Sequence, residues 1–204
     1  KPFSDEAGNG MHVHLSVVDK DGNNVFTMDK NKQPQGLFSH AIGGLLKTTP
    51  DFLSFYAPHS NSYRRLVHNG DHAPTTLSWG NENRTALIRL PEASDEATRL
   101  EFRVASADSN PYLVFASVLA SVYAGIQGKL KHDKETIGNA HAQHPPSLGV
   151  TWREAVEKTS VSSLVKDFFG EQFQQCYTCV KKSEINRFES TITDFEYHSY
   201  LRSL

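Results

Sequence analysis

Two histidines, His12 and His14, lie two positions apart near the beginning of the chain, just after Gly8 and Gly10. The residues around them alternate between apolar and polar, which is the period of a β-strand. Residues two apart on a strand project to the same side, so both imidazoles and the following Ser16 face one shared polar site. A plain solvated strand face shows the same pattern. The glycines favour a binding site, because they let a ligand approach the backbone closely.

A second alternating run places Arg99, Glu101 and Arg103 on one strand face and apolar residues on the other. A carboxylate between two guanidinium groups has a lowered pKa and stays ionised. Such a carboxylate can ligate a hard cation, and the arginines can donate paired hydrogen bonds to carboxylate or phosphate oxygens. The alternative is a surface ladder of ion pairs whose members satisfy one another.

Further arginines add to this cluster, at Arg64, Arg65, Arg84 and Arg89. With two histidines and a carboxylate they indicate an anionic ligand, and phosphate with a metal ion is the simplest chemistry that uses them all. The chain contains neither of the common glycine-rich phosphate loops and no Gly-x-Ser-x-Gly motif. A nucleotide site in this chain would therefore have another design.

Cys176 and Cys179 form a Cys-x-x-Cys motif and are the only cysteines of the chain. The motif is typical of a redox pair or half of a zinc site. It lies inside an expected amphipathic helix without a second pair of ligands, which favours two ordinary helix positions. With two cysteines, a disulfide-built secreted scaffold is excluded and a reducing compartment is favoured.

Composition narrows the class of protein. The chain has 204 residues, of which 38% are hydrophobic and 22% charged, with a net charge of −2. These values fit a globular domain with a core and give no support to a nucleic-acid partner. There is no apolar run of about 18 residues, so we expect no membrane association. No secretory signal is visible, and we expect a cytoplasmic protein.

Apolar periodicity assigns the elements that must position these residues. Alternation of apolar and polar residues predicts strands at 10–18, 85–90 and 99–104. Helical spacing of apolar residues predicts helices at 37–47 and 112–130. The second helix begins after Asn110 and Pro111 and is rich in apolar residues, so we expect it to be buried on most sides. The polar segment 68–74 is typical of a surface loop.

The last part of the chain, from residue 152, is expected to be mostly helical, with Thr193 as the N-cap of a final short helix. We therefore predict an α+β fold. A mostly antiparallel, curved sheet backed by helices carries the site within residues 1–111, and residues 112–204 are mainly helical.

Five segments in order resemble motifs of the glutamine synthetase family. The segment 8–14 resembles its Gly-Ser-Gly-Met-His-x-His strand, and 61–67 resembles its Asn-Ser-Tyr-Lys/Arg-Arg-Leu-Val segment. The other matching segments are 73–91, 99–103 and 110–112. Near the end of the chain, 169–173 and 192–197 are similar to the γ-glutamyl-amine ligase branch, which includes γ-glutamylputrescine synthetases.

The resemblance implies an ATP-dependent ligase that activates the γ-carboxylate of glutamate as an acyl phosphate, which ammonia or an amine then attacks. The matching positions imply the following roles. His12 and Glu101 ligate a divalent cation, Mg²⁺ or Mn²⁺. His14, Ser16, Arg84 and Arg89 bind ATP, and Gly8, Arg65, Arg84 and Arg103 bind glutamate. Arg84, Arg89 and Arg103 neutralise the transferring phosphoryl group. This agrees with the chemistry of phosphoryl transfer, which needs positioned positive charge.

The resemblance covers only the C-terminal half of a family member. The N-terminal β-grasp domain and the strand that brings most carboxylate metal ligands have no counterpart here. We therefore expect this chain alone to lack ligase activity, and we expect its full-length parent to form a homo-oligomeric ring, hexameric or dodecameric. The alternative is a non-catalytic family relative that serves as a structural or a nucleotide- or metal-binding module.

A second departure lies in the flap of the family, which usually carries Glu just before Ala-Pro. Here His72 occupies that place, with Asp71 beside it. A neutral His72 can take a proton from an amine near pH 7, but it lacks the negative charge that attracts ammonium. We hypothesise that the acceptor is an amine or that activity has been lost. Ala7, where the family commonly has Asn, leaves the amino-acid specificity open.

Overall fold

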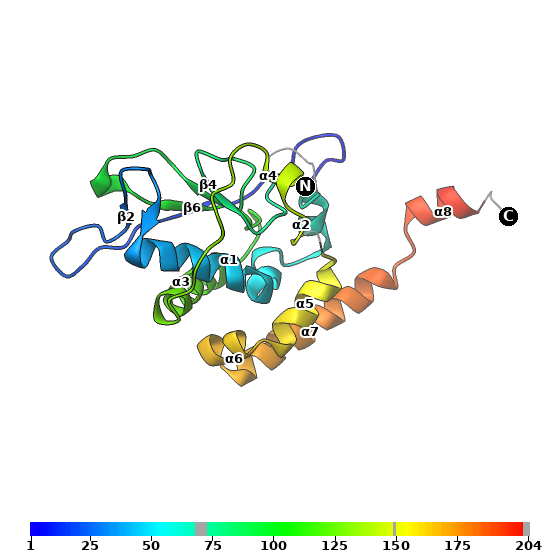
Figure 1. Cartoon of the computed structure of the whole chain (residues 1–204). Coiled ribbons are helices and arrows are strands. Elements are labelled where there is room, and N and C mark those ends of the chain that lie inside the picture. Colours follow the sequence, from blue (N-terminus) through cyan, green and yellow to red (C-terminus); the bar gives the residue numbers. More distant parts are fainter. Residues whose placement is uncertain (68–72, 149, 202–204) are drawn as a thin grey trace.

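The computed structural model describes residues 1–67, 73–148 and 150–201. The strands lie on one side of the helices α1 (Gly36–Tyr56) and α3 (Pro111–Gln127), as Figure 1 shows. The core is formed by large apolar side chains of this layer and of the sheet, among them Phe52, Trp79 and Phe102. This arrangement, together with the extensive helix, confirms the α+β class.

The main sheet has four strands in the order β1 (Val13–Leu15), β6 (Leu100–Phe102), β5 (Ile88–Leu90) and β4 (Trp79–Asn81). β6 pairs antiparallel with both β1 and β5, whereas β4 and β5 are parallel, so the sheet is mixed. A separate pair, β2 (Thr27–Met28) and β3 (Pro34–Gln35), is antiparallel. The curvature of the sheet stays a prediction.

The register of the main sheet sets the site. His14 lies opposite Glu101 in the pair of β1 with β6, and Arg89 lies opposite Glu101 on the other side. Directly opposed residues of neighbouring strands project to the same face of a sheet. A histidine, a carboxylate and a guanidinium therefore form one row across three strands.

Helix α1 runs nine residues beyond the predicted end at residue 47 and contains Pro50. Proline removes a hydrogen bond inside a helix. Apolar side chains on both sides of Pro50 are nevertheless buried, including Leu46 and Phe52. Burial of this continuous apolar face outweighs the helix-breaking effect of Pro50. The end of the helix was therefore predicted too early.

Helix α3 begins as predicted, because the Asn110 side chain accepts hydrogen bonds from the backbone N–H groups of Tyr112 and Leu113. Its burial, however, was predicted wrongly. One face packs on α1, but the opposite face exposes four large side chains, namely Tyr112, Phe115, Leu119 and Tyr123. Composition alone shows that a helix is apolar; it does not show how many of its faces have a partner.

The chain after residue 150 is helical, as predicted: α5 (Trp152–Val161), α6 (Ser163–Phe169), α7 (Glu171–Glu189) and α8 (Asp194–Tyr200). Thr193 caps α8 in a capping box with Glu196, which confirms the predicted N-cap. Figure 1 shows α8 apart from the other helices. Short helices complete the fold: α2 (Ser60–Arg65), η1 (Asp95–Ala97) and α4 (Ala140–Gln143). No helix in the described ranges is long and apolar enough to cross a membrane.

Candidate functional site

The centre of the candidate site is the carboxylate of Glu101 on β6, which is 4% exposed. Its Oε2 accepts a hydrogen bond from Nη1 of Arg89 at 2.8 Å. Its Oε1 accepts from Nη1 of Arg103 at 3.1 Å and lies 2.7 Å from Nδ1 of His12. Glu101 and Arg103 are buried, whereas His12 and Arg89 are partly exposed, so the centre of the group is not a solvated ladder, although its members do satisfy one another.

Charge at this centre is set by the arginines. Burial by itself would raise the pKa of Glu101, but the hydrogen bond from Arg89 and the charge of Arg103 lower it below its usual value. The pKa of His12 is lowered, mainly by burial and further by Arg103. A neutral His12 donates its Nδ1–H to Glu101 and keeps the lone pair of Nε2 available as a ligand.

His14 lies on the same side as His12, as the strand period predicts, with its Nε2 4.0 Å from Oε1 of Glu101. Its Nδ1 accepts a hydrogen bond from Nε of Arg99 at 3.3 Å. With Nδ1 accepting, the N–H of the ring is on Nε2, toward the carboxylate. Sequence reasoning placed Arg99 on this face but did not assign it to His14.

Arg89 binds a second carboxylate that the sequence analysis missed. Its Nη2 lies 2.7 Å from Oε2 of Glu82, and this hydrogen bond raises the pKa of Arg89. Glu82 follows β4, which pairs in parallel with β5, so the contact depends on a strand pairing that periodicity does not reveal. Arg103 is 4% exposed, and its Nη2 donates to the backbone oxygen of Arg84 at 2.9 Å.

Arg65 reaches the site from α2, where its Nη2 donates to the backbone oxygen of Val104. Burial lowers the pKa of Arg65 to about 10, so the guanidinium stays charged at neutral pH. A Cβ at Gly8 would lie 2.9 Å from Cγ of Arg65, and one at Gly10 would lie 3.2 Å from its Nη1. The structure thus gives the glycines a role that the sequence did not indicate, because they make room for this arginine.

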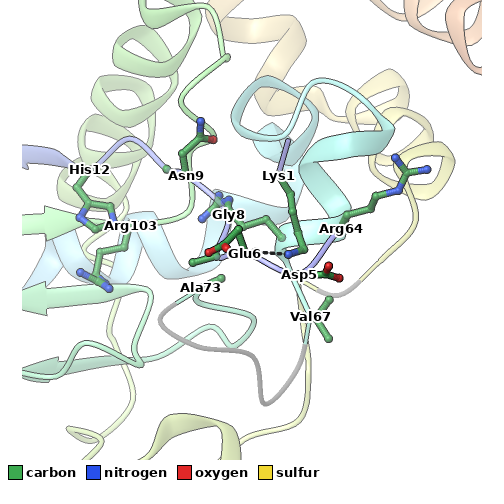
Figure 2. A pocket seen from close by; sticks show the side chains of 13 residues that line it. Lys1, Asp5, Glu6, Gly8, Asn9, His12, Arg64, Val67, Ala73 and Arg103 are labelled. Atoms are coloured by element: carbon green, nitrogen blue, oxygen red, sulfur yellow. Dashed lines mark hydrogen bonds between the residues drawn. The ribbon is translucent and has the colours of Figure 1, made fainter. Parts of the chain in front are cut away.

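A cavity of about 430 Å³ opens beside this network. It is lined in part by His12, Arg65 and Arg103, as Figure 2 shows for His12 and Arg103. The N-terminal segment forms another part of its wall and brings the carboxylates of Asp5 and Glu6. A cavity with guanidinium groups and an imidazole suits an anionic, metal-associated ligand.

The other predicted residues are placed as follows. Gly8 lines the cavity, and Glu101, His14 and Arg89 adjoin it through the contacts above. Ser16 is exposed just past the end of β1, and Arg84 is exposed, with its backbone oxygen accepting a hydrogen bond from Arg103. Asp71 and His72 lie outside the described residues. The cysteines of the Cys-x-x-Cys motif are exposed on α7 and are not among the residues that line the cavity.

The donor set for a divalent cation is partial. In the described ranges, no group of three or more His, Cys, Asp or Glu side chains is arranged to hold a metal ion. His12 and Glu101 supply two adjacent donors, whereas Mg²⁺ takes about six ligands. The two side chains fit one edge of such a site, and the remaining ligands would be water, phosphate oxygens or other polypeptide.

Comparison with known proteins agrees with this geometry. Residues 1–200 match the family model described as the catalytic domain of glutamine synthetase. The chain is 33% identical over its whole length to γ-glutamylputrescine synthetase of Escherichia coli, of which it covers 43%. It is 34% identical over 95% of its length to γ-glutamylethanolamide synthetase of Streptomyces coelicolor, covering 41% of that protein. It is also 34% identical over 98% of its length to a glutamine synthetase of Thermotoga maritima, covering 47%. The chain thus spans less than half the length of these relatives.

Proposed function

Because the chain belongs to the glutamine synthetase family, we propose that it supplies part of the active site of an ATP-dependent carbon–nitrogen ligase. The reaction joins the γ-carboxylate of glutamate to ammonia or an amine through an acyl phosphate. The observation that carries the proposal is the buried Glu101 carboxylate, held by His12, Arg89 and Arg103 beside a cavity that Arg65 also lines.

Each residue has a role that its surroundings support. His12 and Glu101 hold a divalent cation, Mg²⁺ or Mn²⁺, which when bound neutralises phosphate charge and orients the phosphoryl group. Arg65, charged and fixed against Gly8, binds the carboxylate of glutamate. Arg103 is buried and already oriented by Glu101, so it stabilises negative charge at the phosphoryl group without reorganisation.

The nucleotide would be ATP, held by His14, Ser16, Arg84 and Arg89. The side chains of His14, Ser16 and Arg84 are exposed, and Arg89 is partly accessible. These groups supply donors for phosphate and ribose oxygens. Arg84 and Arg89 add positive charge where the triphosphate must be held.

We propose that the acceptor is an amine. Two relatives at 33% and 34% identity carry names of γ-glutamyl-amine synthetases. The residue pair Asp71 and His72, in place of the Glu of the family flap, supports the same acceptor. His72 takes a proton from the amine in this scheme.

The chain covers less than half of these relatives, and its two metal donors form an incomplete set. We therefore propose that further polypeptide completes the site and that the whole protein acts as a homo-oligomeric ring. The experiment measures the intact mass of the natural gene product and its ATP-dependent formation of γ-glutamyl amides. Ammonia, putrescine and ethanolamine serve as acceptors.

We expect turnover with an amine above that with ammonia in the natural product, and turnover by this chain alone no higher than that of its His12→Ala variant. Clear turnover by this chain alone would refute its incompleteness. A natural product that binds ATP and Mn²⁺ without turnover would instead support a non-catalytic binding module, and a clear preference for ammonia would refute the amine acceptor.

A further inference from the structure

A second cavity lies where α2, α5 and α7 meet. We name it the α2–α7 groove; it has a volume of about 480 Å³ and is lined by residues that include His59, Asn61, Arg64, Trp152, Arg187 and Phe188. Arg64 also lines the cavity of the candidate site, so the two cavities are neighbours. In Figure 2 the side chain of Arg64 extends away from His12 and Arg103.

The groove carries uncompensated positive charge. Within the described part of the chain, the guanidinium groups of Arg64 and Arg187 form no ion pair or hydrogen bond. The carboxylate in the lining, that of Glu184, is already bound to Nζ of Lys181 at 2.8 Å. His59 is likewise engaged, with its Nε2 2.7 Å from Oδ2 of Asp108. Two arginines therefore remain available to an anion.

The same junction holds a buried donor that lacks an acceptor. Trp152 lines the groove and is 9% exposed, and its Nε1–H has no hydrogen-bond partner among the described residues. Buried donors are nearly always satisfied in proteins, so an unmatched indole N–H at the wall of a positively charged groove points to a ligand.

We propose that the α2–α7 groove binds a small oxyanion, the carboxylate or phosphate group of a metabolite, between Arg64 and Arg187. Guanidinium groups donate paired hydrogen bonds to both kinds of oxyanion. A bound anion compensates the two positive charges, and its oxygens, or a water that they hold, supply the acceptor that the indole N–H lacks. The exposed ring of Phe188, which meets the Trp152 ring edge to face at 6.4 Å, gives the ligand an apolar wall.

The chain contains two tryptophans, which makes the test direct. The ¹H–¹⁵N spectrum of the chain shows one indole signal for each, and Trp152→Phe assigns them. Trp79 is an internal control, because it is 1% exposed and its Nε1 donates to the backbone oxygen of Asp133 at 2.8 Å. Inorganic phosphate and succinate are titrated separately at constant ionic strength, since general screening would otherwise change with concentration.

We expect a saturable shift of the Trp152 signal with at least one of the two anions and no shift of the Trp79 signal. Arg187→Gln should weaken the binding about tenfold, the effect of losing one charge-assisted hydrogen bond. Lys182→Gln removes the same charge from α7 outside the groove lining and should leave the affinity unchanged. An unaltered Trp79 signal shows that each variant is folded.

The response to phosphate or to succinate identifies which oxyanion the groove prefers, and either supports the site. A shift that does not saturate, an equal shift of both indole signals, or equal weakening by the two variants would overturn the proposal. The titration needs no nucleotide, divalent cation or turnover. Its outcome is therefore independent of the ligase function proposed above.

Discussion

Replacement of Glu101 by Gln tests whether the buried carboxylate holds the site together. Glu101 accepts from Arg89 and Arg103 and lies against His12. Gln keeps the volume but loses the charge, and its NH₂ group faces a guanidinium donor. Removal of one partner of a buried ion pair costs about 3–5 kcal/mol. We expect about 3 kcal/mol, at the lower end, because Arg89 and His12 are partly exposed.

The matched control is Glu82→Gln. Glu82 also binds Arg89, but its side chain is 51% exposed, so the loss should stay within about 1 kcal/mol. Urea unfolding gives the two free energies, and thermal unfolding of Glu101→Gln should show a midpoint lower by about 6–12 °C, at about 2–4 °C per kcal/mol. Equal losses for the two variants, or a loss below about 1 kcal/mol for Glu101→Gln, would refute the reasoning that this carboxylate is an electrostatic centre.

Three further predictions follow from the described contacts. Gly44→Ala places a Cβ 2.2 Å from the backbone oxygen of Ser121 on α3. Urea unfolding should therefore show a free energy of unfolding lower by about 3 kcal/mol. A loss below about 1 kcal/mol would mean that α1 and α3 separate easily. The pKa of Glu154 is lowered mainly by a hydrogen bond from the backbone N–H of Thr151 and further by one from its hydroxyl. Thr151→Ala removes only the hydroxyl, so NMR titration should show that pKa rising part of the way toward its ordinary value, with about 1 kcal/mol of stability lost to the missing cap. In the wild type this carboxylate's contribution is present above the ordinary pKa and disappears as pH falls through the lowered one, and an unchanged pKa in the variant would contradict this. Mn²⁺ should broaden the NMR signal of the His12 imidazole, and Glu101→Gln should reduce this effect severalfold; equal broadening in both proteins would exclude Glu101 as a metal ligand.

Local signals in the sequence predicted local structure well. The caps at Asn110 and Thr193 were predicted correctly, because a cap depends on residues within one helical turn. The end of α1 was not, since the helix passes Pro50 to bury an apolar face that extends on both sides of it. The outer face of α3 was also predicted wrongly, because exposure depends on which segments lie nearby in space.

In the candidate site, too, the sequence predicted local features but not contacts between distant segments. Alternation placed His12 and His14 on one face of their strand, and Glu101 with its flanking arginines on one face of another strand. The order and spacing of these motifs indicated the family. The contact between Arg89 and Glu82 had no sequence signal, because it follows from the parallel pairing of β4 with β5. The α2–α7 groove likewise joins helices that are far apart in the chain.

The sequence by itself determined the residue types, the face of each strand on which they lie, and the family. Only the tertiary structure decided that His14, Glu101 and Arg89 form one row, and that Arg65 enters the site against Gly8. The period of a strand fixes which side a residue faces, but strand order and register depend on contacts between distant segments. Burial of the sheet and of α1 selects those contacts, and with them the charges that surround Glu101.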